Sequence, residues 1–478
     1  MSPLFTPRDR DLLLDLLRLP TVNPLEREPD GPRATGAGPV PRPQDGTASY
    51  AHGAARPRGP LAEAQRRYAA AAAEFGLRPV YHASPPAAVL ERPGVPAPVR
   101  EAARDPGFLA AQPSLVLRLG PPRPPAGTLM FNVHLDTVAG AGPFAFDGAR
   151  FTGRGSADAK GPAVALLAGL RAAAAHRRVG EALTVLVQAV AGEEGGALGT
   201  YGTRPLVEAG YHGHLNVFCE PTGLRALPRA TAAMTARITV DGRDAVDDRP
   251  DAGHNATVLL GFLAQHLARG LDRAVPGTRV CVAGLHTGRL HNRVHGSGTL
   301  LLNLSYASTP AGRRLAAALT GQLDSALHAF TELFGHTREF GRTAQDAAAI
   351  ARLTWDKRDL PALDNPAAWA ERLLTGAGAP PAPPDDPGFT CDAIWAAGLE
   401  GAHTTVLGPG TLDANRAHAA GEFIDLADLE AYAGIIHRLT TRYADLLSSR
   451  DATASRDPRP AGPPPDPPPV RPTAEDPA

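Results

Sequence analysis

The hydrophobic pattern up to about residue 230 predicts helices and strands that alternate along the chain. Leucines at helical spacing predict a helix from Thr6 to Leu17, and a second helix is expected at about 61 to 75. Apolar runs predict strands in "SLVLRLG", at Thr128 to Val133 and in "ALTVLVQAV", with a helix in "GPAVALLAGLRAAAAH" between the last two. Strands that are apolar on both faces and alternate with helices indicate an α/β domain with a mostly parallel central sheet flanked by helices.

The pattern changes near residue 230. In "AMTARITVD" apolar and polar side chains alternate, which is typical of a strand with one face in water. The residues that follow predict, in order, a helix at 255–269, strands at 278–286 and 297–306, a long helix at 311–333 and a closing strand at 349–355. This β-α-β-β-α-β order predicts a small α+β, ferredoxin-like domain inserted into the larger one.

The α/β character returns from about residue 360, through "GAHTTVLGPG" and a helix expected at 425–447. We therefore expect the larger domain to comprise residues 1–228 and 358–450, and the inserted domain residues 229–357. Residues 31–60 are rich in Pro, Gly and Arg and are expected to form a long loop. The proline-rich segment 451–478 has too little apolar content to fold and is expected to be a disordered tail.

Composition excludes some classes of protein. Acidic and basic residues nearly cancel over the 478 residues, to a net charge of -1, so neither nucleic acid nor an anionic membrane is an expected partner. Arginine supplies almost all of the basic charge. We interpret the scarcity of lysine, found only at Lys160 and Lys357, as GC-rich coding bias without functional weight.

The cysteines and the N-terminus suggest a cytoplasmic protein. Cys219, Cys281 and Cys391 are scattered and fit neither a disulfide framework nor a CxxC metal site. Charged residues interrupt the N-terminal segment where a signal peptide needs an apolar run, and no apolar stretch of about 18 residues occurs. We therefore expect a soluble protein in a reducing cytoplasm.

Several apolar strands end in polar clusters that could carry chemistry. The clusters are His134 and Asp136 in "FNVHLD", Glu193 and Glu194 in "VQAVAGEEGG", Glu220 in "LNVFCE", His418 beyond "TVLGPG", and Asp158 in the loop "GRGSADAKG". The carboxyl ends of strands in an open α/β sheet converge on one crevice, so these residues can meet there. Histidines with several carboxylates and no cysteine form a ligand set suited to Zn²⁺, Co²⁺ or Mn²⁺.

Each motif alone has a plainer interpretation. A His-x-Asp at a strand end is usually a hydrogen-bonded turn, Glu-Glu before Gly-Gly is usually a solvated loop, and His418 alone would be a surface residue. Five such motifs at strand ends, in a workable order, favour the metal site over five unrelated turns.

In order, "HLD", "GRGSADAKG", "GEEGG", "CEPTG" and "GPGTLDANRAHAAGE" resemble the motifs of the M20 family of zinc metallopeptidases. This group includes aminoacylases, glutamate carboxypeptidases, succinyl-diaminopimelate desuccinylases and acetylornithine deacetylases. The resemblance spans about residues 6 to 445. It implies two divalent metal ions, most often Zn²⁺, bridged by Asp158. His134 and Glu220 would complete one site, and Glu194 and His418 the other.

The resemblance also implies roles for residues beside the metal ligands. Glu193 would be the general base that takes a proton from the attacking water and passes it to the leaving amine. Asp136 would hold the second imidazole nitrogen of His134 and so orient that ligand. In the family, the asparagine matched by Asn292 points towards substrate; the plain alternative is a turn residue. Cys391 and Asp392 fall where relatives line the substrate pocket, although such a cysteine is more often a buried thiol.

Two positions of the inserted lid domain depart from the family pattern. Val246 replaces a histidine that stabilises the tetrahedral oxyanion from a neighbouring active site, a loss expected to cost on the order of 100- to 1000-fold in turnover unless another group replaces it. Ser305 replaces an arginine that grips a substrate carboxylate, which weakens the case for a substrate with a free alpha-carboxylate. The nearby histidines His254, His286, His291 and His295 are either substitute donors or surface residues.

The leading hypothesis is therefore a two-metal amidohydrolase or peptidase that cleaves a small N-acyl amino acid, dipeptide or related amide. A specialised biosynthetic amidase or acyl-transfer enzyme with the same metal site is the alternative, and a non-catalytic binding protein is a third. A homodimer through the inserted domain is possible, as relatives often form one.

Overall fold

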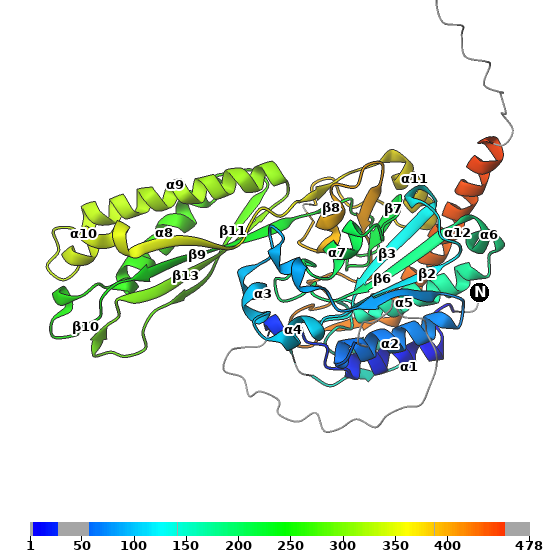
Figure 1. Cartoon of the computed structure of the whole chain (residues 1–478), viewed down its shortest axis with the longest axis horizontal. Helices are drawn as coiled ribbons and strands as arrows, with labels where there is room; N and C mark the ends of the chain where they lie inside the picture. The colour runs from blue at the N-terminus through cyan, green and yellow to red at the C-terminus, as the bar shows by residue number, and fades with distance from the viewer. Residues whose placement is uncertain (1–2, 27–56, 141, 387, 455–478) are drawn as a thin grey trace, which may run out of the picture.

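The computed structural model describes residues 3–26, 57–140, 142–386 and 388–454. Its larger part is built around a six-stranded sheet in which only β2 runs against its neighbours, while β6, β3, β7 and β16 are parallel (Figure 1). In spatial order the strands are β1 (Arg78–Ala83), β2 (Ser114–Leu119), β6 (Thr184–Val190), β3 (Thr128–His134), β7 (Leu215–Phe218) and β16 (His403–Val406). The predicted α/β fold with a mostly parallel sheet is confirmed.

Both faces of this sheet are buried, as the continuous apolar runs require. Along β3, Leu129, Phe131 and Val133 join one hydrophobic cluster, and Met130 joins a second cluster on the other face. The first cluster also contains residues of four helices that pack beneath the sheet: α1 (Pro7–Arg18), α2 (Pro60–Ala73), α5 (Lys160–Ala174) and α12 (Leu426–Ala454) (Figure 1). These helices and strands leave the carboxyl end of β3 pointing at the polar cluster described below.

The second part of the molecule contains a four-stranded antiparallel sheet in the order β11-β13-β9-β14. Its elements are β9 (Ala232–Asp241), α8 (Ala256–Leu271), β11 (Thr278–His286), β13 (Ser297–Tyr306), α9 (Thr309–Phe334), α10 (Gly341–Ile350) and β14 (Ala351–Lys357). The predicted β-α-β-β-α-β order is present. Helix α10 was not predicted, and β14 therefore begins two residues after the predicted start at 349.

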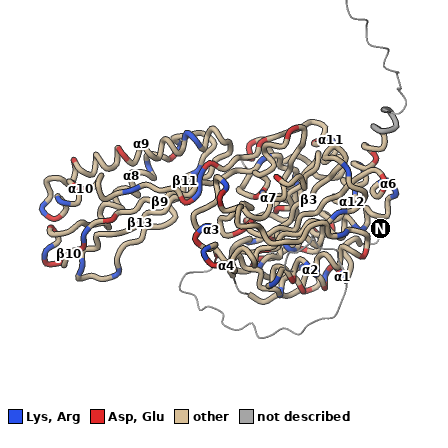
Figure 2. Tube along the Cα trace, viewed as in Figure 1, with Lys and Arg blue, Asp and Glu red and all other residues tan. Residues whose placement is uncertain are grey.

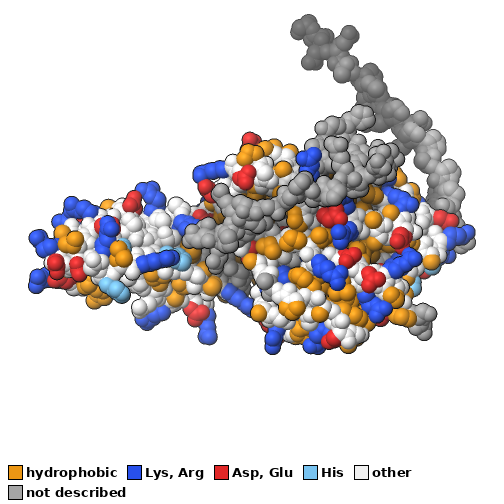
Figure 3. Space-filling view, turned by 90° about the horizontal axis from the view of Figure 1, so that it is seen from below, with side chains coloured by type: hydrophobic (Ala, Val, Ile, Leu, Met, Phe, Trp, Pro, Cys, Tyr) orange, Lys and Arg blue, Asp and Glu red, His pale blue; other side chains and the backbone are white. Residues whose placement is uncertain are grey.

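Figure 1 shows this second part extending from one side of the larger one. The chain passes into it after β8 (Arg229–Ala230) and leaves it before β15 (Leu363–Asp364), and these two short strands pair antiparallel. Acidic and basic residues are interspersed along both parts (Figure 2), and the face seen in Figure 3 mixes apolar, acidic and basic side chains. In the portion that the structure describes, no helix is both long and apolar enough to cross a membrane.

Besides β1, β8 and β15, several short elements were not predicted. They are α3 (Ala97–Ala102), α4 (Pro106–Ala110), α6 (Arg177–Ala182), α7 (Thr203–Glu208), α11 (Ala368–Ala377), β4 (Ala145–Phe146), β5 (Arg150–Thr152), β10 (Ala245–Val246), β12 (Arg293–Val294), β17 (Phe423–Asp425) and the 3₁₀ turns at Pro24–Glu26, Ala87–Glu91, Pro125–Gly127, Pro250–Ala252 and Asp392–Ala396. Most of the loop expected at 31–60 lies outside the described residues. Helix α12 runs to Ala454, four residues into the expected tail, and the rest of that tail also lies outside them.

Candidate metal centre

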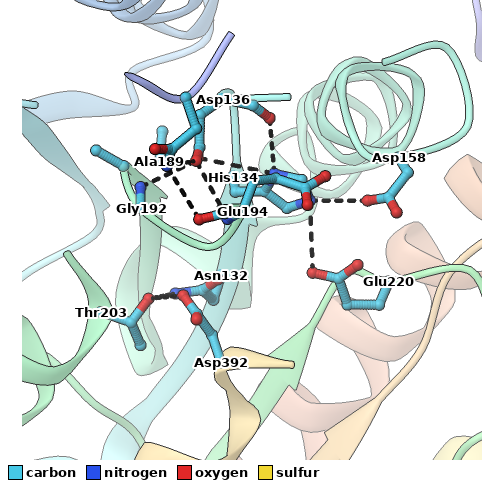
Figure 4. A network of polar contacts seen from close by, with 12 residues as sticks. Asn132, His134, Asp136, Asp158, Ala189, Gly192, Glu194, Thr203, Glu220 and Asp392 are labelled. Carbon is cyan, nitrogen blue, oxygen red and sulfur yellow. Dashed lines mark hydrogen bonds and ion pairs between the residues drawn. The ribbon is translucent and has the colours of Figure 1, made fainter. Parts of the chain in front are cut away.

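His134, the last residue of β3, forms the buried end of a cluster of polar side chains (Figure 4). Its Nε2 lies 2.8 Å from Oδ1 of Asp158 and 3.7 Å from Oε1 of Glu220. Asp158 comes from the loop before α5, and Glu220 follows β7, the parallel neighbour of β3. Three segments far apart in the sequence thus meet at the carboxyl edge of the sheet, as expected for an open α/β fold.

The other oxygen of Asp158 contacts a second histidine. Oδ2 lies 3.1 Å from Nε2 of His418, and the same nitrogen lies 3.1 Å from Oε1 of Glu194. The side chain of His418 is about half exposed, whereas Asp158 and Glu194 are buried, so the cluster opens to solvent on the side of His418. Asp158 therefore stands between two histidines, with one oxygen directed to each.

Three groups of side chains in the described residues offer ligand atoms close enough together to hold a metal ion, all within 4.8 Å of one another. They are His134, Asp158 and Glu220; Asp158, Glu194 and His418; and His134, Glu193 and Glu194. The first two groups coincide with the two ligand sets that the resemblance implies, and they share Asp158. The third adds Glu193, which the resemblance leaves free as a base.

The electrostatics of the cluster fit bound cations. Burial raises the pKa of the Glu220 carboxyl to about 8 and that of Glu194 to about 7, and the negative charge of Asp158 adds to both effects. Hydrogen bonds to Asp158 and Glu194 raise the pKa of His418 to about 10. The crowded carboxylates give the cluster an excess of negative charge. Two divalent ions would balance this charge, and their binding would displace the protons from the imidazole nitrogens.

Glu193, next to Glu194 in the chain, is half-buried. Burial first, and then the charge of Glu194, raise the pKa of its carboxyl well above the ordinary range. A carboxyl group in such surroundings can hold a proton near neutral pH.

Asp136 differs from the prediction. The Nδ1 of His134 lies 2.9 Å from the backbone carbonyl oxygen of Asp136, whereas the nearest carboxylate oxygen of Asp136 is 3.8 Å away. The carboxylate instead accepts hydrogen bonds from the backbone N–H groups of Gly192 (3.1 Å) and Glu194 (3.2 Å) and from Nδ2 of Asn23 (2.9 Å). Its side chain thus orders the turn that carries the two glutamates, and its backbone orients the imidazole.

The three predicted substrate contacts lie in different places. Cys391 and Asp392 are each 1% exposed, and the Asp392 carboxylate accepts a hydrogen bond from the Thr203 hydroxyl (Figure 4). Burial first, and then the charge of Glu220, raise the pKa of the Cys391 thiol, so the two residues lie beside the cluster and their contact with substrate stays a prediction. Asn292 precedes β12, which pairs with β10 at the end of the second part remote from the central sheet (Figure 1). Within one chain it does not approach the candidate metal ligands.

The structure also shows where the residues of the second part that differ from the family pattern lie. Val246 lies on β10 and is 58% exposed. Of the histidines considered as substitutes, His254 is engaged locally: its Nδ1 accepts from the backbone of Arg243, and its Nε2 lies 3.0 Å from Asp346. It therefore does not act on the cluster from its own chain.

Comparison with known families identifies the chain. The sequence profile of peptidase family M20/M25/M40 matches residues 130–442, which is more than half of the chain. The chain belongs to this family. The predicted resemblance to the M20 metallopeptidases is confirmed, and with it the broad class, because members of the family hydrolyse amide and peptide bonds.

Individual proteins resemble the chain over part or most of its length. A protein of Aeropyrum pernix named as a [LysW]-lysine/[LysW]-ornithine hydrolase is 30% identical over 196 residues, which cover 41% of this chain; the chain spans about half, 51%, of that relative. An M20 metallo-carboxypeptidase of Sulfolobus solfataricus has a TM-score of 0.62 and 11% identity, covering 92% of this chain and 100% of that one.

Two further solved structures are similar. Human carnosine dipeptidase 1 has a TM-score of 0.59 and 14% identity, covering 92% of this chain and 98% of the other. A Bacillus subtilis protein described as a dinuclear metal-binding peptidase of the M20 family has a TM-score of 0.55 and 10% identity, with the same two coverages. At these identities the likenesses show the M20 fold.

Proposed function

We propose that this M20 protein is a metal-dependent hydrolase that cleaves the amide bond of a small N-acyl amino acid, a dipeptide or a related amide, with two Zn²⁺ as the expected ions and Co²⁺ or Mn²⁺ as alternatives. The position of Asp158 carries the proposal, because its two oxygens meet different histidines at 2.8 and 3.1 Å. Family membership and the description of the Bacillus subtilis protein as dinuclear support it.

His134, Asp158 and Glu220 would hold one ion, and Asp158, Glu194 and His418 the other. Bound divalent ions at such a site supply Lewis acidity, which polarises a carbonyl and lowers the pKa of water. The protein keeps the ligands in place through the buried sheet edge on one side and the Asp136 network on the other. The side chain of His418 is half exposed, so the cluster is open to solvent on that side and a substrate can approach from there.

Glu193 would move the proton in this reaction. Glu194 is directed to His418, so the adjacent carboxylate of Glu193 remains available to accept a proton from the attacking water. The same carboxyl then gives the proton to the leaving amine nitrogen. Glu194 would therefore bind the cation, and the adjacent Glu193 would carry the proton.

The test is hydrolysis by purified, Zn²⁺-loaded protein of a panel of N-acetyl amino acids and dipeptides, alongside Glu193→Gln. We expect wild type to cleave at least one member, and the variant to bind the same amount of metal while losing about 100- to 10,000-fold in kcat. Wild type that carries two ions per chain yet cleaves no member of the panel would contradict the proposal. Product analysis with an added amine separates hydrolysis from acyl transfer.

A second candidate is release of a basic amino acid from a conjugate. The Aeropyrum pernix relative is named for lysine and ornithine conjugates. Beside Glu220, a hollow of about 240 Å³ is lined by Leu227, Phe389 and Leu412 together with Asp386 and Asp413, which suits an apolar stem with a cationic end.

This candidate predicts a preference among acyl amino acids. N-acetyl-lysine and N-acetyl-ornithine should be cleaved with at least a 10-fold higher kcat/KM than N-acetyl-leucine, and Asp413→Asn should remove the preference. Equal rates for the three compounds would leave the general amidase as the better description.

We also propose a homodimer through the second part of the chain. Strand β11 is at the edge of its sheet, and Val282 and Leu285 on it are 39% and 38% exposed. Sedimentation should give twice the monomer mass, and Val282→Lys should shift the protein towards monomer.

A further inference from the structure

The two lysines of the chain are both buried, although 48 residues carry a basic side chain. Lys160 is 1% exposed and Lys357 is 7% exposed. Coding bias explains why lysine is scarce, but it does not explain why the two that occur stand at buried positions. A compact ammonium fits a narrow buried space that the wider arginine fork does not, so a structural or functional requirement for lysine is expected at both.

Lys160 is accounted for by packing. Its Nζ donates to the backbone carbonyl oxygens of Leu16 at 2.9 Å and Leu19 at 3.1 Å. These carbonyls lie at the carboxyl end of α1, where helix C=O groups lack partners and attract positive charge. Lys160 therefore ties α1 to α5.

Lys357 is not accounted for in this way. In the part of the chain that the structure describes, its ammonium makes one hydrogen bond, a long one of 3.3 Å to the carbonyl oxygen of Gly196, and no ion pair. An ammonium has three donors. A buried cation with so few partners is costly unless another group completes its surroundings.

The backbone aims Lys357 at the catalytic turn. The pairing of β14 with β9 shifts register between Trp355 and Lys357, so this bulge brings Lys357 opposite Thr235 on the polar face of the sheet. β-Bulges re-aim side chains in this manner beside active sites. Gly196, its acceptor, belongs to the turn that carries Glu193 and Glu194.

The charge of Lys357 lies close to the proposed base. Burial lowers the pKa of its ammonium to about 8, and the negative charge of Glu193 acts in the opposite direction. The group therefore remains largely protonated at neutral pH. Other cations of this polar face stand elsewhere: Arg237 is paired with Asp356, and Arg352 lies opposite Thr239. Arg279 is exposed on β11, opposite Ser305 and three strands away from Lys357 in the sheet order.

We infer that Lys357 is a specificity-determining residue whose ammonium binds a free carboxylate of the amide substrate beside Glu193, an inference that rests on the proposed function. Bound metal ions would neutralise the ligand carboxylates, but the free carboxylate of Glu193 would repel an anionic substrate group, and a cation at this place offsets the repulsion. Ser305, on the same polar face, carries no charge to do so. The preferred substrates are then amides that retain a free acid, such as N-acyl amino acids and dipeptides, over their carboxamides.

The experiment compares the N-acetyl amino acid that wild type cleaves fastest with the same compound as its C-terminal carboxamide. Lys357→Met should lower kcat/KM for the free acid by about 10- to 100-fold, the usual worth of a charge-assisted hydrogen bond, and change that for the carboxamide by less than about 3-fold. Arg352→Met, which removes a cation from the same strand and face, should leave both values unchanged.

A measurement on wild type keeps the inference testable if Lys357→Met does not fold. The free amino acid product should inhibit wild type at least 10-fold more strongly than its carboxamide. Equal loss on both substrates in Lys357→Met, or equal inhibition of wild type by acid and carboxamide, would overturn the role of Lys357 while leaving the hydrolase itself established. Absence of any hydrolysis by wild type would instead overturn the proposed function.

Discussion

Single residues that bind neither metal nor substrate hold the candidate centre in shape. The Asp136 carboxylate gathers the backbone N–H groups of Gly192 and Glu194, and Asn23 joins the same oxygen from the segment after α1. The side chain of Asn23 also lies 3.1 Å from the carbonyl oxygen of Glu194. A fully buried amide thus fixes the turn from behind, which determines where Glu193 and Glu194 point.

Asn23→Ala should weaken this support. We expect the free energy of unfolding to fall by about 1–3 kcal/mol, because buried acceptors lose their donor. Metal affinity should fall by about 10- to 100-fold, as is usual when a group that supports ligands is removed. Urea denaturation and competition with a metal chelator measure the two effects. Asn303→Ala, at an exposed position of β13, serves as the control and should change neither; an unchanged metal affinity in Asn23→Ala would contradict the supporting role.

Some residues of the candidate centre could be predicted from the sequence, and others could not. His134, Glu194 and Glu220 follow apolar strands, so the change from buried to polar residues locates them. Asn23 carries no such mark, because its partner Asp136 is 113 positions away. The spacing of His134 and Asp136 cannot distinguish a carboxylate contact from a carbonyl contact, so the sequence could not show that the carbonyl oxygen of Asp136 lies nearer to the imidazole than its carboxylate.

At the scale of elements, the crossing of α5 and α12 supports the loop that presents Asp158. Gly169 lies in the middle of α5 where it meets α12, and a Cβ added there would stand 2.5 Å from the carbonyl oxygen of Ala433 and 2.7 Å from Cβ of Ile436. The two helices can approach this closely only because Gly169 has no side chain. A shift of α5 would also move the loop before it.

Gly169→Ala should therefore destabilise the protein by about 1–3 kcal/mol through overpacking. Gly261→Ala is the matched substitution in the middle of α8, where an added Cβ meets nothing within 4 Å, and it should stabilise by roughly 0.5–1 kcal/mol through higher helix propensity. Chemical denaturation monitored by circular dichroism distinguishes the two. Equal effects of the two substitutions would show that the helix crossing tolerates a methyl group.

Elements with strong hydrophobic patterns were predictable, and those with weak ones were not. Strands β11 and β13 begin and end at the predicted residues, because apolar and polar positions alternate along that region. Helix α10 buries mainly glycine, alanine and threonine, which give little hydrophobic signal. Strand β1 is a half-exposed edge strand that contains Pro79, a residue typical of loops and edges.

At the scale of the whole molecule, the pairing of β8 with β15 brings the two crossings of the chain side by side. We propose that residues 229–357 form the inserted unit and residues 1–228 and 358–450 the larger one. The hydrophobic cluster that fills the second part also includes Met130 and Phe218 of the central sheet. The two parts therefore share buried surface, which fixes Lys357 relative to the glutamate turn.

Metal removal should lower the stability of the whole molecule, because the candidate ligands come from five segments that meet only in the folded chain. A metal that binds the folded state alone stabilises it by about 2.7 kcal/mol at a free concentration 100 times its dissociation constant. In a chain of this size we expect a chelator to lower Tm by several degrees and added Zn²⁺ to restore it. Thermal scans with and without chelator measure this.

Asp158→Asn tests whether both ions depend on the shared carboxylate. The variant should bind fewer than two ions per chain and lose most of the Zn²⁺-dependent rise in Tm, because Asp158 contacts both histidines. Its metal-free Tm should fall below that of metal-free wild type, because the amide removes the negative charge that both histidines contact, so the test compares the Zn²⁺-dependent rise in Tm within each protein. Asp244→Asn, in an exposed pair with Arg293, is the control and should respond to Zn²⁺ like wild type. An undiminished response in Asp158→Asn would mean that the stabilising ions bind elsewhere, and the placement of both metal sites would then be wrong.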